Sequence, residues 1–246
     1  MTHGCLIVTG GSRGIGAATA RLAARQGYRV CLTYLRDEAA ARAVVSDIER
    51  TGGMAIAAPG DVGKVDDVTS VFSIAERELG PLAGLVNNAG ITGRIGHFAD
   101  EDSATFESVV RTNVLGSLYC AQEAVRRFLP RRKGAIVNLS SVAATTGAPS
   151  EYVHYAASKA AIDAFTVGLA KEVAADGIRV NAVAPGSTLT DIHAAAGEPD
   201  RPARVKDRIP MHRLADAEEI ARAILWLLSE EASYVTGAVL RVSGGF

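Results

Sequence analysis

The chain is poor in the residues that build disulfide frameworks and metal centres. Only three of its 246 residues are cysteines, namely Cys5, Cys31 and Cys120, and they lack paired spacing. Because their number is odd and they fall inside expected strands and helices, we expect reduced, buried thiols. The five histidines are scattered along the sequence. The composition therefore predicts neither disulfides nor a bound metal.

An excess of charge of one sign and long apolar runs are also missing. The formal net charge is −1 at pH 7, which gives no electrostatic reason to expect nucleic-acid or membrane binding. No apolar run approaches the roughly 18 residues that indicate a membrane-spanning helix. The first residues lead directly into a strand-like segment, with no room for a signal peptide. We therefore expect a cytoplasmic protein.

What the sequence does contain is a regular alternation of apolar, strand-like segments with helical ones. With 48% hydrophobic residues, a chain of 246 residues can bury one sizeable core. The alternation predicts an α/β fold, in which a single doubly wound, Rossmann-like parallel sheet carries helices on both faces. We expect one domain spanning 1–246. The expected strands are 5–9, 28–34, 54–58, 82–86, 135–140, 178–183 and 238–242, and the expected helices are 14–26, 37–51, 64–79, 102–132, 153–175 and 216–229.

A glycine-rich turn joins the first expected strand to the first helix, in CLIVTGGSRGIGAATARLAARQG. Gly10, Gly14 and Gly16 remove side chains where the chain turns, where a pyrophosphate would approach the backbone, and where the helix packs on the sheet. The helix N-terminus then offers free N–H groups and the positive end of its dipole to phosphates. Glycines also serve plain turns, but this position at the start of an alternating chain predicts a dinucleotide site.

Tyr155 and Lys159 stand four residues apart in the run HYAASKAAIDAF. Helical spacing places both side chains on one face of a helix. A phenol with a pKa of ~10 is a weak acid near neutrality, and an ammonium about 5 Å away favours the phenolate by roughly 3 kcal/mol at a dielectric of about 20. We therefore expect Lys159 to lower the pKa of Tyr155 toward neutrality and make it a general acid and base. Taken alone, the same pentapeptide also fits an ordinary surface pair.

Together with Asn87-Asn88-Ala89-Gly90, Asn113, Ser141 and Pro185-Gly186, these motifs make the chain resemble the short-chain dehydrogenase/reductase family over essentially its whole length. The glycine spacing is that of the single-domain members and differs from that of the longer epimerase branch. The resemblance implies an NAD(P)(H)-dependent oxidoreductase. Such an enzyme transfers a hydride between the nicotinamide and a small carbonyl or alcohol substrate.

The resemblance also implies catalytic roles for four residues. Tyr155 would exchange a proton with the substrate oxygen, and Lys159 would hydrogen-bond the nicotinamide ribose. Ser141, rather than Ser140, would orient the substrate carbonyl. Asn113 would hold a water of the proton relay, although asparagine also caps helices. The interval from Ser141 to Tyr155 is 14 residues, one longer than is usual in the family, so we expect the substrate side of the site to differ.

Cofactor choice depends on the end of the second strand, where an acidic residue would bind the ribose 2′-hydroxyl of NAD. Here Arg36 stands in that region, and with Ser12 and Arg13 it offers positive charge and a hydroxyl to a 2′-phosphate. Both arginines also fit solvated surface positions, and Asp37 follows. We expect NADP(H) to be preferred and NAD(H) to be possible. By resemblance, Asp61 and Val62 would bind the adenine, and Asn88 and Ala89 the adenosine side. Thr188 and Thr190 would bind the nicotinamide and the phosphates. The implied cofactor site also includes Ile15, Gly90, Pro185 and Gly186.

Residues 188–212 contain the least regular part of the chain. The resemblance implies that this segment is a substrate lid, and a plain surface loop is the alternative. The last strand ends in Ser243-Gly244-Gly245, where the family often has Asp-Gly-Gly. The family's usual assembly, and apolar positions on helices 102–132 and 153–175 and near the C-terminus, predict a homotetramer.

Two alternative functions stay open. The first is that of a 3-oxoacyl-[acyl-carrier-protein] reductase, which Asp176 disfavours, because such members tend to carry a basic residue there. Arg131, Arg132 and Lys133 nevertheless offer a basic surface to a carrier protein. The second is a non-catalytic, NADP-sensing binding protein, which we expect to have lost catalytic residues, whereas this chain has lost none.

Overall fold

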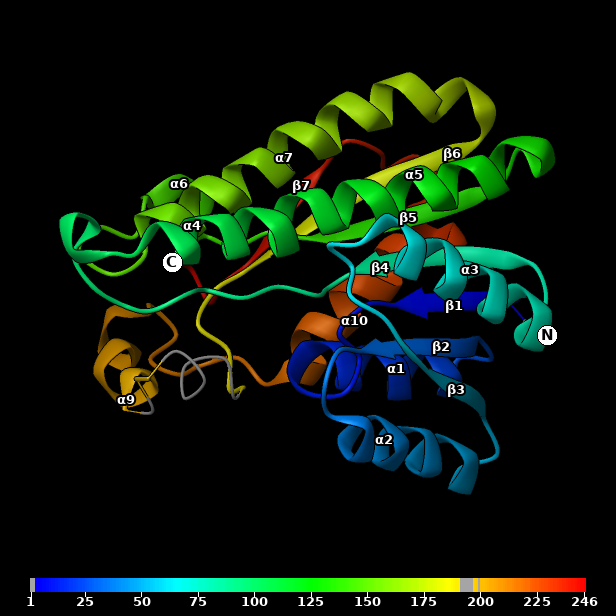
Figure 1. The fold of residues 1–246 in the computed structure, drawn as a ribbon, viewed down its shortest axis with the longest axis horizontal. Helices are drawn as coiled ribbons and strands as arrows, with labels where there is room; N and C mark the ends of the chain where they lie inside the picture. Colours follow the sequence, from blue (N-terminus) through cyan, green and yellow to red (C-terminus); the bar gives the residue numbers. More distant parts are fainter. Residues whose placement is uncertain (1–2, 191–196, 199) are drawn as a thin grey trace.

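A seven-stranded parallel sheet forms the centre of the molecule (Figure 1). The computed structural model describes residues 3–190, 197–198 and 200–246. The strands lie in the order β3-β2-β1-β4-β5-β6-β7. Because the order reverses between β1 and β4, the loops after these strands leave a crevice at their carboxyl ends. The bounds are β1 Cys5–Val8, β2 Arg29–Tyr34, β3 Met54–Pro59, β4 Leu82–Asn87, β5 Gly134–Leu139, β6 Ile178–Pro185 and β7 Val239–Val242.

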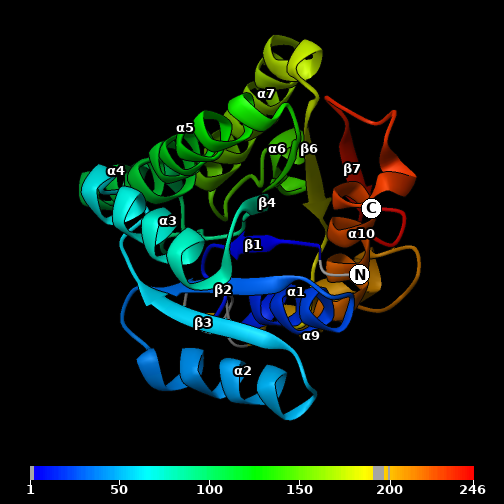
Figure 2. The same ribbon diagram turned by 90° about the vertical axis from the view of Figure 1, so that its right-hand side faces the viewer.

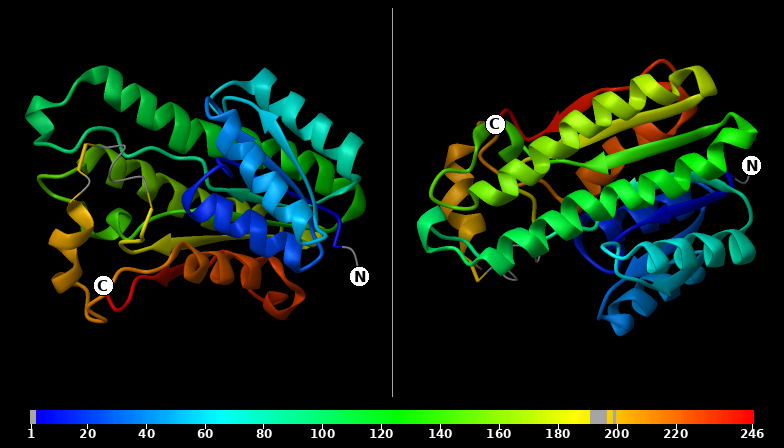
Figure 3. Two further views of the ribbon diagram at one scale, coloured as in Figure 1. Left: turned by 90° about the horizontal axis from the view of Figure 1, so that it is seen from below. Right: turned by 45° about the horizontal axis from the view of Figure 1, so that its top comes forward.

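Helices cover both faces of the sheet (Figures 2 and 3). Leu6 and Val8 of β1 join one core, whereas Cys5 and Ile7 join the other. Because central strands are buried on both faces, they are apolar almost throughout. The doubly wound α/β fold is therefore confirmed. One layer consists of α1 (Gly14–Arg25), α2 (Glu38–Arg50) and α10 (Ala217–Leu228), and the other of α3 (Val65–Leu79), α5 (Gly116–Phe128) and α7 (Val153–Val173).

The long helix predicted over 102–132 is not a uniform α-helix. It begins as α4 (Ser103–Val109), continues as a π-helical segment η2 (Val110–Leu115), returns to α-helix in α5, and ends in the 3-10 turn η3 (Leu129–Arg131). A π-helical turn closes i to i+5 hydrogen bonds and commonly marks functional positions. Asn113 lies in this segment and is fully buried. The irregularity thus falls on a predicted site residue.

Short helices that the sequence did not predict lie near the carboxyl ends of the strands. The helix α6 (Ala143–Thr146) stands between Ser141 and Tyr155, and α9 (Arg201–Val205) lies within the predicted lid. Figure 1 shows α6, α9 and the start of α7 at the same end of the molecule. Residues 191–196 and 199 of the predicted lid lie outside the described residues. The remaining turns are η1 Phe98–Asp100, η4 Ala174–Asp176, η5 Lys206–Arg208 and η6 Glu230–Ala232.

The three cysteines are free and buried in the core. Burial raises the pKa of Cys5 and of Cys120 to about 12, so both are thiols at neutral pH. Among the described residues, no group of histidine, cysteine and acidic side chains is arranged to hold a metal ion. No helix in that part of the chain is both long and apolar enough to cross a membrane.

Candidate active site

The glycine turn brings backbone segments closer together than side chains would allow. Gly10 has a φ of 62° and Gly14 a φ of 55°, both in the left-handed region. A Cβ on Gly16 would lie 2.4 Å from the main-chain oxygen of Gly10. A Cβ on Gly10 would lie 3.0 Å from the Cα of Ala89. Glycine is therefore required where the turn packs against α1 and against the end of β4.

Hydrogen bonds from neighbouring strands hold this turn in place. Asn88 Nδ2 donates to the main-chain oxygens of Thr9 and Gly10, at 2.8 and 3.0 Å. The Thr9 hydroxyl accepts from the N–H groups of Asn88 and Ala89, each at 3.0 Å, and Thr33 Oγ1 accepts from the N–H of Gly10 at 3.0 Å. Asn88, predicted on the adenosine side, thus uses its amide to shape the turn. Sequence reasoning missed the supporting roles of Thr9 and Thr33, for which the only signal was a threonine near the end of each apolar strand.

The first turn of α1 has the features of a phosphate site. The helix begins at Gly14 after Arg13, which makes no side-chain cap, so the first N–H groups of the helix have no such partner. A Cβ on Gly14 would lie 3.3 Å from Cγ2 of Thr190, which places this threonine beside the turn. Ile15 follows in the first turn and packs partly buried against the core. The backbone, helix end and threonine together suit a pyrophosphate.

Arg36 lies just beyond the end of β2, exposed to solvent, and Ser12 and Arg13 lie in the glycine turn after β1. Because β1 and β2 are paired neighbours, both arginines lie near the carboxyl ends of adjacent strands. Asp37, which follows Arg36, accepts the N–H of Ala40 at 2.9 Å through one carboxylate oxygen and so caps α2. Asp37, the acidic residue that weakened the NADP interpretation, thus serves as the N-cap of α2.

Asp61 and Val62 follow β3, next to the end of β2. Asp61 Oδ1 accepts the N–H of Gly63 at 2.9 Å, so its carboxylate shapes the turn. Asp61 and Val62 line a small cavity together with Thr9 and Thr33. The predicted adenine residues therefore share one end of the sheet with the glycine turn.

Pro185 and Gly186 end β6 and connect it to the loops on either side. The Pro185 oxygen accepts the N–H of Val142, at 3.1 Å, and the N–H of Gly186 donates to Val242 at 2.9 Å. A Cβ on Gly186 would lie 2.8 Å from the Cα of Ser243, so glycine is needed there. Thr188 Oγ1 donates to the Gly186 oxygen at 3.1 Å. These bonds tie the end of β6 to the loop after β5 and to β7, and Thr188 and Thr190 follow directly in the chain.

Ser141 and Tyr155 meet across the start of α7. The Ser141 side chain acts to lower the pKa of the Tyr155 phenol, although burial has the larger effect and raises it. Ser141 Oγ also accepts the N–H of Ala143 at 3.1 Å. Ser140, in contrast, points its hydroxyl toward the main-chain oxygen of Lys159, 3.4 Å away. The structure thus brings Ser141, and not Ser140, to the phenol.

The electrostatics of Tyr155 and Lys159 differ from the sequence prediction. Burial raises the pKa of Tyr155 to about 12, where we expected a decrease. Burial also lowers the pKa of Lys159 to about 8, an effect that Asp163, one turn later on α7, opposes. Lys159 Nζ lies 5.6 Å from the centroid of the Tyr155 ring and donates to the Leu139 oxygen. The helical spacing correctly predicts that the two side chains lie close together. It does not predict how burial shifts their pKa values, because burial depends on residues from other elements.

Asn113 connects the loop after β4 to α7. Its Oδ1 accepts the N–H of Ile91, and its Nδ2 donates to the Ile91 oxygen and to Ser158 Oγ, all at 2.9 to 3.0 Å. Because Asn113 lies inside a continuous helical run, it is not a helix cap. A Cβ on Gly90 would lie 3.3 Å from Asn113 Oδ1 and 3.5 Å from Lys159 Nζ, so the three residues meet at one point.

The fold and site define a nicotinamide-dinucleotide oxidoreductase. The glycine turn at the start of α1 suits a dinucleotide, and Ser141, Tyr155 and Lys159 lie beyond the carboxyl ends of β5 and β4, where such folds bind ligands. Residues of the glycine turn, of the loop after β3 and of the segment after β6 would hold the cofactor, which supplies or accepts the hydride when bound.

Comparisons with known proteins give the same class. A family model described as enoyl-(acyl carrier protein) reductase matches residues 10–246. The chain is 48% identical over 242 residues to the uncharacterized oxidoreductase YgfF of Escherichia coli, covering 97% of this chain and 98% of that protein. It is 36% identical to the 3-oxoacyl-[acyl-carrier-protein] reductase FabG of Staphylococcus aureus, covering 97% and 96% of the two chains. The crystal structure of a dehydrogenase/reductase from Sinorhizobium meliloti matches with a TM-score of 0.92 at 34% identity, covering 100% of this chain and 95% of that chain.

The chain belongs to the short-chain dehydrogenase/reductase family. Members of this family are oxidoreductases that act on alcohol and carbonyl groups and use NAD(P)(H).

Proposed function

We propose that the chain is an NADP(H)-preferring oxidoreductase that interconverts a small carbonyl compound and its alcohol, with Tyr155 as the proton donor and acceptor. The observation that carries this proposal is that Lys159 Nζ lies 5.6 Å from the centroid of the Tyr155 ring and donates to Leu139 at the end of β5, which Ser141 follows after one residue. A substrate oxygen that accepts from the hydroxyls of Ser141 and Tyr155 would be polarised and positioned for protonation.

Each of the other residues has a positioning task in this proposal. Lys159 would supply positive charge near the phenol and a donor to the nicotinamide ribose. Asn113 would fix the loop at Ile91 and the face of α7 that carries Ser158, which donates to the Tyr155 main-chain oxygen at 2.7 Å. These contacts hold Tyr155 in a defined orientation before substrate arrives.

The preference for NADP(H) rests on Arg36 and Arg13. Among the described residues neither arginine forms an ion pair, and Asp37, the acidic residue beside Arg36, caps α2 through one carboxylate oxygen. A 2′-phosphate would supply the missing negative charge through charge-assisted hydrogen bonds. NAD(H) lacks this group and would bind through the remaining contacts alone.

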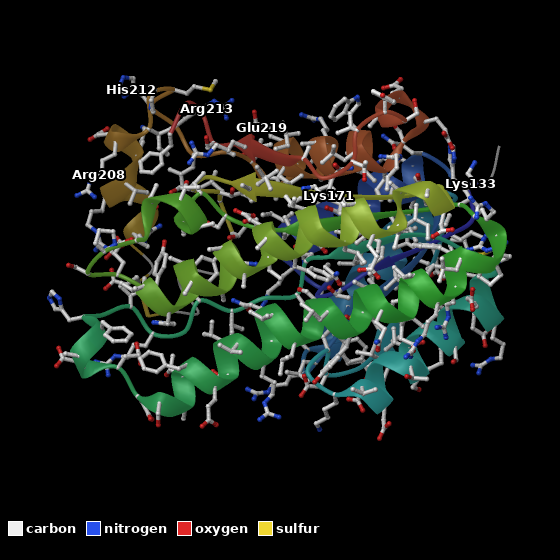
Figure 4. The ribbon with its side chains drawn as sticks, turned by 90° about the horizontal axis from the view of Figure 1, so that it is seen from above. Lys133, Lys171, Arg208, His212, Arg213 and Glu219 are labelled. Atoms are coloured by element: carbon white, nitrogen blue, oxygen red, sulfur yellow. The ribbon has the colours of Figure 1, made fainter. Side chains whose placement is uncertain are left out.

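The basic residues that suggested a carrier protein are engaged elsewhere in the molecule. Arg131 donates to the Leu82 oxygen, Arg132 pairs with Asp176 at 3.0 Å, and Lys133 pairs with Glu230 at 3.0 Å. Figure 4 shows Lys133 at the opposite end of the molecule from Arg208, which follows α9. These positions favour a small free substrate over a carrier-bound one.

The assay is the oxidation of NADPH in the presence of a panel of small ketones, aldehydes and diketones. We expect turnover with at least one of these compounds and a lower kcat/KM with NADH than with NADPH. A protein that binds NADPH but turns over none of them would support the sensing function instead. If the protein turned over only a thioester of acyl carrier protein, the result would favour the 3-oxoacyl-[acyl-carrier-protein] reductase alternative.

A further inference from the structure

The loop before α7 builds a wall beside Tyr155. Ala148 and Ser150 have φ values of 44° and 60°, a left-handed conformation that L residues rarely adopt. This loop, which contains the extra residue of the Ser-to-Tyr interval, brings Tyr152 against Tyr155 edge to face, with 5.2 Å between ring centroids. Tyr152 is 7% exposed and packs with Ala148 in a small apolar cluster. The side of the candidate site next to Tyr155 is therefore formed by a buried aromatic ring.

Arg201, the first residue of α9, covers this wall. Its Cζ lies 5.2 Å from the centroid of the Tyr152 ring. Its Nη2 lies 2.6 Å from a carboxylate oxygen of Glu151, the residue before Tyr152. The side chains of Arg201 and Glu151 are 9% and 24% exposed. A buried cation and its counter-ion thus stand one aromatic ring away from the proposed proton donor.

The donors of Arg201 are not all used. Its Nε is buried and has no hydrogen-bond partner among the described residues. A buried donor without a partner is unfavourable, and it invites an acceptor from a ligand. Among the described residues, Arg204 is the second cation near Glu151, but its side chain is half exposed and lies 3.9 Å from the carboxylate. Arg201 is therefore the cation whose charge Glu151 chiefly cancels.

The charge of Arg201 also acts on the hydroxyl of Tyr155. Burial raises the pKa of Tyr155, and Arg201 is among the groups that act in the opposite direction. A substrate bound to Tyr155 would therefore lie one aromatic ring away from Arg201, because Tyr152 packs against both residues.

We propose that Arg201 and Glu151 set the charge of the substrate, so that the site binds an uncharged carbonyl compound and rejects one that carries a carboxylate. This inference rests on the proposed function, because it takes Tyr155 as the residue that faces the substrate. A carboxylate would meet the charge of Glu151 as well as that of Arg201, and the repulsion from Glu151 opposes its binding. An uncharged oxygen can accept from Arg201 Nε and leave the pair intact.

Butyrate and butyramide provide a matched test, since they are similar in size and differ by one charge. Their affinities for the NADP⁺-saturated protein can be obtained from the shift of the melting temperature with ligand concentration. We expect the wild type to bind butyramide more tightly than butyrate. Glu151→Gln frees the guanidinium, so its affinity for butyrate should rise about tenfold, on the scale of one charge-assisted hydrogen bond. Butyramide binding should change little.

Two further variants assign the effect to the pair. Adding Arg201→Met to Glu151→Gln should remove the gain in butyrate affinity, and Arg204→Met alone should behave as the wild type. The exchange of charges in Glu151→Arg with Arg201→Glu should restore the preference for butyramide, which covers the case in which a single variant folds poorly.

An unchanged butyrate affinity in Glu151→Gln overturns the inference, and so does a gain that persists without Arg201. Failure of the proposed function has a different signature. In that case wild-type protein reduces no carbonyl compound, while the two ligand affinities still report on the pair.

Discussion

Lys159 Nζ donates a hydrogen bond to the main-chain oxygen of Leu139, 2.6 Å away, and so ties the middle of α7 to the last residue of β5. The partner is neutral, and Lys159 as a residue is only 5% exposed. Burial therefore lowers the pKa of Lys159 to about 8, while burial raises that of Tyr155 to about 12. Of the two groups, Lys159 is the one that titrates near physiological pH.

Removing the Tyr155 hydroxyl should separate catalysis from cofactor binding. We expect Tyr155→Phe to abolish turnover and leave NADPH affinity nearly unchanged, because the ring still packs against Tyr152. Lys159→Met should reduce both, since it removes a ribose donor as well as the charge. Steady-state rates and fluorescence titration with NADPH measure the two effects. More than a few per cent of the wild-type rate in Tyr155→Phe would rule out its proposed role.

The pKa of Lys159 predicts a pH dependence of stability. The pKa is about 8 in the folded protein against an ordinary value of 10.5, so between these values the unfolded chain binds more protons. The contribution of Lys159 to the free energy of unfolding therefore rises with pH across that interval, by up to about 3 kcal/mol at ~1.4 kcal/mol per pKa unit. Below the interval the ammonium is charged in both states, and the folded protein bears the full cost of burying it. Urea unfolding of wild type and Lys159→Met at a series of pH values isolates the effect. Parallel stability curves would contradict it.

Arg36→Ala should weaken NADPH binding by about 1.5–3 kcal/mol, the scale of a hydrogen bond to a charged group, and leave NADH binding almost unchanged. The reason is that only NADPH carries the 2′-phosphate that we place at Arg36. Calorimetric titration of both cofactors measures the difference. Equal losses for the two cofactors, or tighter binding of NADH by wild type, would exclude this phosphate site.

Asn88→Ala should act on both cofactors alike. It removes the two donors that hold the main-chain oxygens of Thr9 and Gly10, and leaving buried acceptors unpaired costs about 1–3 kcal/mol. We expect a lower free energy of unfolding and a matched loss of NADPH and NADH affinity. Asn88→Asp, which turns the donor into an acceptor, should be worse. Denaturant unfolding and titration with both cofactors provide the check, and a loss confined to NADPH would contradict a purely supporting role.

Light scattering should give the mass of four chains at micromolar concentration. Tyr234 is 102% exposed, Trp226 40% and Phe246 44%, which leaves a large apolar group uncovered near the C-terminus. Ala157 and Ala161 form an exposed small-residue face on α7. Trp226→Asp should yield dimers if α7 makes the second contact. A wild-type mass of one chain would refute the assembly.

The fold was predictable from the sequence because its signals are local. Apolar strands separated by amphipathic helices specify a parallel sheet, and Gly10 and Gly16 mark the turn whatever lies elsewhere in the chain. The spacing of Tyr155 and Lys159 likewise predicts their shared face. Burial is not a local quantity, however, and the direction of the Tyr155 pKa depends on residues that pack around it from other elements.

Contacts between segments that are distant in the chain could not be predicted from the sequence either. Arg201 and Glu151 are 50 residues apart, and nothing in their spacing indicates that they meet. The hydrogen bonds of Asn88 to the glycine turn span 78 and 79 residues. The apolar periodicity of 102–132 predicts a helix but does not distinguish an α-helical turn from the π-helical one at Asn113.

That π-helical turn constrains how the chain can change length. An α-helix advances about 100° per residue, so deleting Val114 or Leu115 would rotate α4 and Asn113 relative to α5 by about that angle. The buried amide of Asn113 would then swing away from Ile91 and Ser158, although every hydrophobic residue of α5 could keep its place on the sheet. A deletion that makes the helix more regular would in this way disconnect the loop after β4 from α7.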